Sequence, residues 1–425
     1  MGGITSEKSL NGQRAGDYVL QQHVADGAMG AVYRARRVSA DSAGHDPVAD
    51  VGPPGVQPSQ APADPGFDDV WAVKVLHPRW AADPVACERF FREFETMQSL
   101  DHPAIVRACA VGKLELGAVE GQDSRPYIVM EWVEGRSLDQ HLAALGRLEA
   151  AAALQLSAQI ASALAHAHAR GIIHRDLKPE NILILAREAG WRIKLLDFGA
   201  VKRQLEFGPR LTAAGTTLGS PYYMAPEQAM GKRDLDVRVD VFALGVLSYE
   251  LLSARLPFEG TDVASVLTQI LGGSRIPISS LGLGLPWSLD DVFQRALARQ
   301  PEARYPDVVA LVQALLTACG LRSDLETWAT QPLSEARAQW QAARAQQPSN
   351  QVAAAAAIDV DGPAATTQGR GPVATDGLAA TGAVPAADAS VRGGAGQRRA
   401  LLWVAAIVLA AALAIVLWSR CSPAS

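Results

Sequence analysis

The chain has 425 residues, of which 48% are hydrophobic, and a formal net charge of −5. This length and composition allow a large core and about two folded regions, since domains commonly have ~100 to 200 residues. The mild net charge, together with the lack of a long basic run in the sequence, argues against nucleic acid as a partner.

The cysteines and the first residues set further limits. The 4 cysteines show no C-x-x-C spacing, which argues against a zinc site and against a disulfide framework. No apolar stretch lies near residue 1, so we expect no secretory signal peptide. Residues 1–17 are polar and contain glycine, and we expect them to be disordered.

An extended pattern begins at Tyr18 and leads into a glycine-containing turn. The turn spans Val24-Ala25-Asp26-Gly27-Ala28-Met29-Gly30-Ala31-Val32. Glycines at such a place let the backbone approach a ligand closely, because they have no side chain. Taken alone, the pattern predicts an ordinary turn equally well.

Residues 39–69 differ in composition from the segments on either side. They are rich in Asp, Pro, Gly, Ala and Val and show no periodicity. Such a segment cannot bury enough apolar surface to become ordered. We therefore predict a flexible insertion between two strands.

Val70–Leu76 has the pattern of a buried strand with one charged residue, Lys74. A lysine among apolar strand residues is costly unless an acidic group pairs with it. The next periodic segment, 87–97, predicts a helix with Phe90, Phe94 and Met97 on its buried face. We expect the acidic partner of Lys74 on this helix.

Two further elements precede the most informative part of the chain. Residues 127–135 predict a buried strand that ends in a linker. Residues 150–170 predict a long alanine-rich helix that ends at Gly171, a residue typical of helix C-termini. His166 and His168 on this helix are expected to pack or to face solvent rather than to act as ligands.

The run His174-Arg175-Asp176-Leu177-Lys178-Pro179-Glu180-Asn181 is followed by Asp197-Phe198-Gly199. Two apolar runs between them, 182–185 and 193–196, predict a short hairpin with polar residues at its ends. The arrangement resembles the catalytic loop and metal-binding turn of eukaryotic-type protein kinases. Phosphoryl transfer requires a carboxylate that receives the hydroxyl proton, and an amide and a second carboxylate that hold Mg²⁺.

The resemblance extends over about residues 18–318 and implies an α+β, bilobal protein kinase fold. The small N-lobe would be β-rich and the large C-lobe α-helical. The turn at 24–32 resembles the Gly-rich loop, with Ala25 in place of the first glycine. The strand at 70–76 resembles the V-A-I-K strand, with Trp71 in place of its first valine. Lys74 would then contact the α- and β-phosphates and pair with Glu93.

The resemblance also implies ATP and Mg²⁺ as cofactors, with Mn²⁺ as a substitute. Met130 would be the gatekeeper, and the backbone at Glu131 and Val133 would bind adenine. Asp176 would receive the Ser/Thr proton, and Lys178 would stabilise the transferring phosphoryl group. The implied catalytic residues are Asp176, Lys178 and Asn181, the metal ligands are Asn181 and Asp197, and the ATP-binding residues are Val24, Ala25, Gly27, Gly30, Val32, Ala72, Lys74, Glu93, Glu131, Val133 and Asp197.

Residues 200–224, followed by Ala225-Pro226-Glu227, resemble an activation segment that ends in the A-P-E motif. Arg175, directly before Asp176, would favour an ordered phosphothreonine nearby. The phosphorylation candidates are Thr216 and Thr217, with Thr212 as a close alternative. Two later residues are implied to stabilise the C-lobe: Asp240 would brace the catalytic-loop backbone, and Arg304 would pair with Glu227.

The C-terminal part predicts a tether and a membrane anchor. Residues 319–397 are expected to form a largely disordered juxtamembrane linker, with a weakly helical piece at 333–346. Residues 400–418 are uncharged and apolar, and at ~1.5 Å per residue they would nearly span a ~30 Å hydrocarbon core. Arginines are more numerous before this segment than after it. We therefore predict a single-pass inner-membrane protein with the kinase in the cytoplasm and residues 419–425 outside.

The sequence thus predicts an ATP-dependent kinase that resembles bacterial eukaryotic-like serine/threonine kinases. Its partners would be proteins with Ser or Thr, the membrane, and a second copy that serves trans-autophosphorylation of the activation loop. One alternative is a pseudokinase scaffold, which only Ala25 supports. Others are a membrane-anchored adaptor that acts through its tether, and a small-molecule kinase, which the activation segment disfavours.

Overall fold

A computed structural model describes residues 9–27, 29–38, 69–116, 123–187, 190–197, 221–322 and 324–346. Three predicted features lie outside these residues: all but the last residue of the insertion 39–69, most of the activation segment, and the transmembrane segment 400–418. No helix within the described ranges is both long and apolar enough to cross a membrane.

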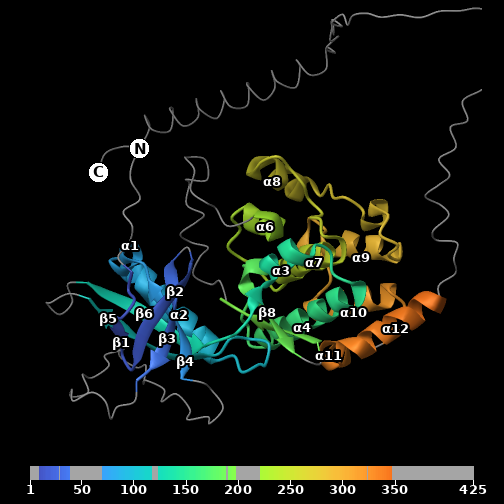
Figure 1. Cartoon of the computed structure of the whole chain (residues 1–425). Coiled ribbons are helices and arrows are strands. Elements are labelled where there is room, and N and C mark those ends of the chain that lie inside the picture. The colour runs from blue at the N-terminus through green and yellow to red at the C-terminus, as the bar shows by residue number, and fades with distance from the viewer. Residues whose placement is uncertain are drawn as a thin grey trace, which may run out of the picture. The chain divides into compact units, whose positions relative to one another are not determined.

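The N-terminal lobe is built on an antiparallel sheet of six strands in the order β1-β2-β3-β4-β6-β5 (Figure 1). The strands are β1 (Arg14–Ala15), β2 (Tyr18–Asp26), β3 (Gly30–Arg37), β4 (Val70–Leu76), β5 (Ala108–Glu115) and β6 (Ser124–Glu131). Two helices follow β4: α1 (Pro78–Ala81) and α2 (Pro84–Gln98). Phe90, Phe94 and Met97 of α2 are buried against Ile128 of the sheet, which confirms the predicted apolar face.

The first strand corrects the prediction that residues 1–17 are disordered. Within the described residues, Arg14 and Ala15 pair with the start of β2, and the Ala15 side chain is fully buried. Leu10 is also buried. Gly16 has a φ of +57°, so a glycine there allows the tight reversal between β1 and β2. The polar composition concealed this short strand because its partner strand supplies the apolar surface.

The C-terminal lobe is helical, with one small sheet. Its helices up to residue 318 are α3 (Leu138–Leu145), α4 (Ala150–His168), α6 (Pro226–Ala229), α7 (Arg238–Ser253), α8 (Val263–Gly272), α9 (Ser288–Ala296) and α10 (Val308–Ala318). The small sheet has the order β7 (Arg136–Ser137), β8 (Ile182–Arg187) and β9 (Gly190–Leu195). Most residues of α4 and α7 are buried on every face, as expected of helices at the centre of a core. The predicted hairpin at 182–196 is present, with Ile182 opposite Leu195.

Two further helices, α11 (Leu325–Thr330) and α12 (Leu333–Gln346), extend this lobe alongside α4 (Figure 1). Trp328 of α11 and Ala336 of α12 are fully buried. Gln155 of α4 donates through Nε2 to the Gln331 carbonyl oxygen at 2.7 Å. The predicted helix at 333–346 is therefore confirmed, but its assignment to a disordered linker is wrong. The small alanine side chains of α4 allow another helix to pack closely against it, and α11 and α12 do so.

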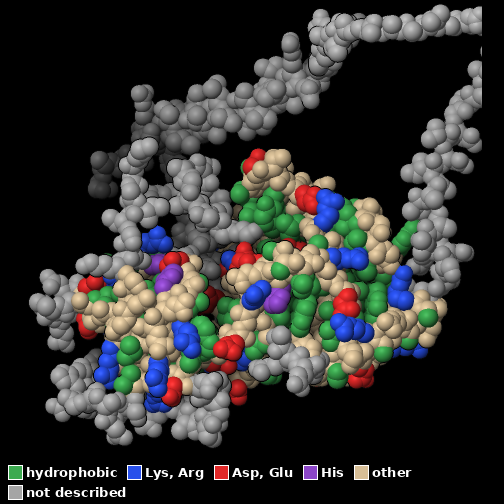
Figure 2. Space-filling model, in the orientation of Figure 1, with side chains coloured by type: hydrophobic (Ala, Val, Ile, Leu, Met, Phe, Trp, Pro, Cys, Tyr) green, Lys and Arg blue, Asp and Glu red, His purple; other side chains and the backbone are tan. Residues whose placement is uncertain are grey.

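The surface charge agrees with the mild net charge of the chain. Figure 2 shows acidic and basic side chains interspersed over the visible face of the described residues. The folded part therefore presents two lobes with a mixed surface, and the residues of interest lie where strands and loops of the two lobes meet.

Candidate active site

The Lys74 side chain links the two lobes. Its ammonium Nζ lies 2.7 Å from Glu93 Oε1 of α2 and 3.0 Å from Asp197 Oδ1, which follows β9. The side chains of Lys74 and Glu93 are 9% and 6% exposed, whereas that of Asp197 is 28% exposed. The predicted pairing of Lys74 with Glu93 is thus present, and Asp197 is a second partner that the sequence pattern did not indicate.

Electrostatics keep this lysine charged. Burial of the ammonium would lower the pKa of Lys74, but the Asp197 and Glu93 carboxylates outweigh that cost and raise its pKa above the ordinary value. Two carboxylates face one ammonium, so the group has an excess negative charge. An excess of this kind suits a site that takes up a cation.

The backbone of the catalytic loop is held by Asp240 of α7. Its two carboxylate oxygens accept hydrogen bonds from the main-chain N–H groups of His174 and Arg175, each at 2.8 Å. His168 Nε2 lies 2.8 Å from the same carboxylate. Burial would raise the pKa of Asp240, yet the hydrogen bonds from His168 and from the Arg175 main-chain N–H hold this pKa below its ordinary value. The predicted brace is confirmed, and His168 packs as part of it.

His174 is fully buried, and both of its ring nitrogens form contacts that hold the catalytic loop in place. Its Nε2 lies 3.1 Å from the Leu196 carbonyl oxygen, and its Nδ1 accepts from the Asp176 main-chain N–H at 3.3 Å. A ring that donates at one nitrogen and accepts at the other is a neutral imidazole. Burial in turn lowers the pKa of His174, so the uncharged form persists.

Two residues of the site have left-handed backbones. Arg175 has a φ of +67° and Asp197 a φ of +40°, a conformation that costs energy for residues other than glycine. The strain at Arg175 is offset by the hydrogen bond to Asp240 and by Gln228 Nε2, which donates to the Arg175 carbonyl oxygen at 2.9 Å. Strained residues of this kind cluster at functional sites, and here they flank Asp176 and the metal-binding turn.

Asp176, Lys178 and Asn181 form a compact group after this strained position. Lys178 Nζ lies 3.2 Å from Asp176 Oδ2. Asn181 Nδ2 donates to the Asp176 carbonyl oxygen at 2.7 Å and to its Oδ2 at 3.1 Å. Asn181 is placed by a short 3₁₀ turn, Pro179–Asn181, directly before β8. The turn therefore brings together all three residues predicted to be catalytic.

The glycine-containing turn joins β2 to β3, with Ala25 opposite Val32. Gly27 N–H donates to the Gly30 carbonyl oxygen at 2.8 Å. A Cβ at Gly30 would lie 2.4 Å from the Val75 carbonyl oxygen. Gly30 is therefore required by the neighbouring strand β4, in addition to any approach of the turn to phosphate.

The predicted hinge starts where β6 ends. Met130 is buried, and the Glu131 side chain accepts from the Arg107 main-chain N–H at 2.9 Å and pairs with Lys194 Nζ at 2.5 Å. Val133 follows in the linker. The Glu131–Lys194 pair joins the end of β6 to β9. This pair was not predicted from the sequence, although Lys194 alternates with apolar residues in β9, a pattern that indicates a charged residue in need of a partner.

The end of the activation segment is anchored in the C-lobe. Glu227 forms two hydrogen bonds with Arg304, Nη1 to Oε1 and Nη2 to Oε2, both at 2.7 Å. This confirms the predicted pair. The three candidate phosphorylation sites, Thr212, Thr216 and Thr217, lie outside the described residues.

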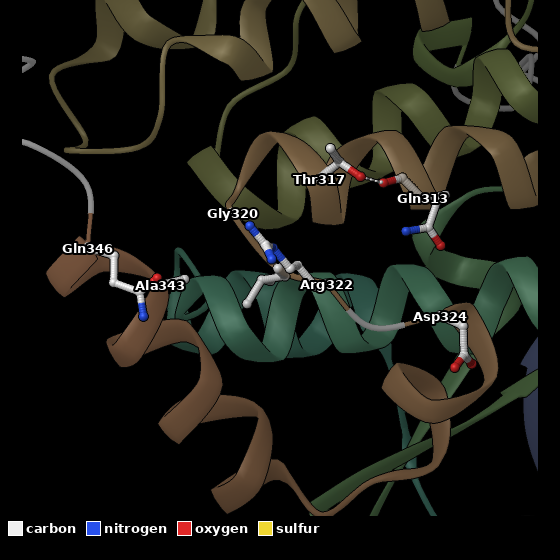
Figure 3. Close-up of a pocket in the computed structure, with 8 residues that line it drawn as sticks. Gln313, Thr317, Gly320, Arg322, Asp324, Ala343 and Gln346 are labelled. Carbon is white, nitrogen blue, oxygen red and sulfur yellow. Dashed lines mark hydrogen bonds between the residues drawn. The ribbon is translucent and has the colours of Figure 1, made fainter.

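The cavities near the C-lobe helices differ in whether they border the catalytic loop. One, of about 290 Å³, borders the catalytic loop and is lined by Asp139, Glu180 and Glu250, among others. Tyr223 donates to Glu250 Oε2 at 2.5 Å beside it, a contact that sequence patterns did not indicate. Another, of about 550 Å³, lies between the end of α10 and α12 (Figure 3). Its lining includes none of the residues predicted to bind ATP or to act in catalysis.

Comparisons with known proteins agree with this geometry. A family model described as protein kinase domain matches residues 66–313. The serine/threonine-protein kinase Pkn1 of Myxococcus xanthus is 34% identical over 316 residues, which are 74% of this chain and 40% of Pkn1. The serine/threonine-protein kinase PknB of Mycobacterium tuberculosis is 38% identical over 254 residues, which are 60% of this chain and 38% of PknB.

A solved structure shows the same fold. The kinase domain of Mycobacterium tuberculosis PknI gives a TM-score of 0.51 at 26% identity, over 72% of this chain and 98% of that domain. The chain spans about two fifths of the length of the curated relatives Pkn1 and PknB. Because the family model covers more than half of it, the chain belongs to the protein kinase family, and the relatives named here are bacterial serine/threonine kinases.

Proposed function

We propose that this chain is an ATP-dependent serine/threonine protein kinase. The observation that carries the proposal is the three-membered charge group of Lys74, Glu93 and Asp197, which joins the two lobes through contacts of 2.7 and 3.0 Å. A lysine held in this way is positioned to bind phosphate oxygens, as the corresponding residue does in protein kinases. The compact group around Asp176 supplies the second half of such a site.

The donor set fits Mg²⁺ bound together with ATP. Mg²⁺ prefers oxygen ligands and is usually held by one or two carboxylates, water and substrate phosphates. Asp197 offers a partly exposed carboxylate. Asn181 uses its amide nitrogen on Asp176, which directs its amide oxygen away from that residue. The described residues contain no cluster of three or more His, Cys, Asp or Glu that could hold a metal alone, so the phosphates would complete the ligand set.

The proposed roles follow from these contacts. When bound, Mg²⁺ would neutralise the charge of the β- and γ-phosphates. Lys74 positions the triphosphate, and Glu93 fixes the lysine. Asp176 accepts the proton of the substrate hydroxyl at its carboxylate, and Lys178 lies close enough to stabilise negative charge beside it. The turn that contains Val24, Ala25, Gly27, Gly30 and Val32, together with Ala72, would enclose ATP, and the backbone at Glu131 and Val133 would hold adenine.

Transfer of label from γ-labelled ATP to a basic protein tests the proposal. A basic substrate is appropriate because Asp139, Glu180 and Glu250 line the cavity beside the catalytic loop. The wild type should label Ser and Thr, and Asp176→Asn should lose nearly all activity. Asp234→Asn, an exposed carboxylate change in a C-lobe loop, is the matched control and should keep activity. Nucleotide binding without any transfer by the wild type would favour the pseudokinase scaffold instead.

We further propose that the activation segment is phosphorylated. Arg175 is half-buried next to Asp176 and its backbone is fixed by Asp240, so its guanidinium could order a phosphothreonine. The candidates remain Thr216, Thr217 and Thr212. Mass spectrometry of wild type and Asp176→Asn after incubation with Mg-ATP should find one of them modified only in the wild type. An active preparation with none of them modified would contradict this part, and concentration dependence of the modification would indicate transfer within a homodimer.

The membrane anchor is a separate proposal about residues 400–418. Its support is the uncharged apolar composition of that segment. The kinase domain would then lie in the cytoplasm, where ATP is available, and the linker before the anchor would begin after Gln346. Membrane fractionation of full-length protein and of a variant that lacks 400–418 tests it, since only the full-length protein should sediment with the inner membrane.

A further inference from the structure

His77 joins the strand that carries Lys74 to the helices beside the sheet. It follows β4 directly and stands immediately before α1. Its carbonyl oxygen accepts hydrogen bonds from the main-chain N–H groups of Trp80 and Ala81 of α1, at 2.9 and 3.0 Å. Although His77 occupies the N-cap position, its side chain does not cap that helix. The imidazole serves a different contact.

That contact is with the glycine-containing turn between β2 and β3. His77 Nε2 lies 3.1 Å from the Gly27 carbonyl oxygen. The main-chain N–H of His77 donates to the Met29 carbonyl oxygen at 2.9 Å. One residue therefore binds two carbonyl groups of the same turn. Because a carbonyl oxygen only accepts, the imidazole must carry its hydrogen on Nε2 to form this bond.

The same turn is fixed at other points as well. The Met29 side chain is buried in the apolar cluster that contains Leu76 and Phe90. Gly27 N–H donates across the turn to the Gly30 carbonyl oxygen at 2.8 Å. Met29 thus anchors the turn through an apolar contact, and the imidazole of His77 binds the turn's backbone from outside the hairpin.

We propose that His77 is a positioning residue for nucleotide binding, because it holds the Gly27 carbonyl and so keeps the turn in the shape that receives the phosphates. The inference rests on the proposed function, in which this turn encloses ATP. A turn that is already ordered loses little conformational entropy when the nucleotide binds, so binding is tighter. Since His77 is placed to act on the turn rather than on the reacting atoms, its loss should weaken binding much more than it slows transfer.

The test compares three variants of the full chain. His77→Ala removes the imidazole but keeps the main-chain bond to Met29, and His77→Gln keeps a side-chain N–H of similar reach. His23→Ala is the matched control: its ring lies on the same hairpin, 40% exposed, and pairs with Asp26 at 3.1 Å instead. The measurements are kcat and KM for ATP, and Kd for the analogue AMP-PNP with Mg²⁺ by calorimetry. Melting temperatures within about 2 °C of wild type show that the variants are folded to the same extent.

His77→Ala should raise KM and Kd about threefold to tenfold, the effect of one hydrogen bond, with kcat within about twofold. His77→Gln should recover most of that loss, and His23→Ala should leave both constants unchanged. Unchanged constants in His77→Ala, equal losses in His77→Ala and His77→Gln, or an equal loss in His23→Ala would each overturn the proposal. The Kd measurement separates it from the proposed function: a wild type that binds AMP-PNP but transfers no phosphate would refute kinase activity alone, whereas a wild type that binds no nucleotide would refute both.

Discussion

Two buried acid–base pairs in this chain have the same separation and very different surroundings. Lys74 lies 2.7 Å from Glu93, and Arg304 lies 2.7 Å from Glu227. The Arg304 side chain is 0% exposed, and each of its five N–H groups meets an acceptor. These acceptors are both Glu227 oxygens and the carbonyl oxygens of Ala298, Arg238 and Arg299.

Lys74 is organised in another way. Two carboxylates share its ammonium, and Asp197 is partly exposed. Within the described part of the chain, the ammonium donates to these two carboxylates, one fewer than its three N–H donors. A buried pair in which every donor has an acceptor stabilises the fold. A pair with an unused donor and excess negative charge is suited to a binding site. Substitutions in the two groups should therefore have different effects.

The largest expected effect is on activity when Lys74 is changed. Lys74→Met should reduce the rate of phosphoryl transfer about 10²- to 10³-fold or more, since a well-placed electrostatic group contributes ~3 to 4 kcal/mol. Stability should fall as well, because the Glu93 side chain, 6% exposed, loses the ammonium, whereas the Asp197 carboxylate, 28% exposed, can gain water. Initial rates with γ-labelled ATP and urea unfolding measure the two effects. A variant with the wild-type rate would show that Lys74 has no part in catalysis.

Arg304→Met should show the reverse order of effects. Removal of one partner leaves the Glu227 carboxylate buried and unpaired, which costs about 3 to 5 kcal/mol of stability. Catalysis at low temperature, per folded molecule, should stay close to wild type. The matched control is Arg255→Met, because Arg255 also binds a glutamate, Glu259, through two hydrogen bonds, but at the surface. A surface pair contributes little, so that control should melt like wild type.

The two pairs were predictable from the sequence because their residues stand at fixed places in kinase motifs. The catalytic loop and the Asp240 brace were predictable for the same reason. The hairpin from Ile182 to Leu195 was predictable from its two apolar runs. What the motifs did not specify is how the chain is held outside them. The contact of His77 with the Gly27 carbonyl and the contact of Lys74 with Asp197 depend on which groups meet in the folded chain, and no spacing in the sequence encodes that.

The folded region extends beyond the limits that the sequence predicted. The composition of 9–17 is polar and that of 324–346 indicates a weak helix at most, yet Ala15 and Trp328 are fully buried. In both cases the apolar surface belongs to a partner element: β2 for the first segment and α4 for the second. Tertiary contact overrides local propensity, and a pattern read along one segment cannot show what covers another.

Trp328→Ala tests whether α11 is part of the folded C-lobe, as the Arg304–Glu227 pair is. The side chain is 0% exposed, and truncation of a buried tryptophan costs about 3 kcal/mol or more. A melting temperature several degrees below that of wild type is therefore expected. Trp287→Ala is the matched control, because Trp287 is 48% exposed and should lose little. Equal melting temperatures for Trp328→Ala and wild type would indicate that α11 is part of the linker and does not stabilise the C-lobe.

The smallest effect concerns pH and the neutral imidazole of His174. Burial lowers the pKa of His174 in the folded chain, whereas the unfolded chain has an ordinary pKa of ~6.5. Above that value both states are neutral, so the group contributes nothing. As the pH falls below ~6.5, the unfolded chain binds a proton at His174 that the folded chain does not bind, and the stability of the folded chain falls. The free energy of unfolding should therefore decline below pH ~6.5 by up to about 1.4 kcal/mol per pH unit for this residue.

Other histidines reinforce the slope, since burial also lowers the pKa of His102, His141 and His166. Urea unfolding at pH 7.5, 6.5 and 5.5 measures it. His102→Gln should make the slope shallower. A flat profile would mean that His174 takes up a proton in the folded chain. The hydrogen bond from the Asp176 main-chain N–H to its Nδ1 would then be lost, and the catalytic loop would not be the saturated structure that its contacts indicate.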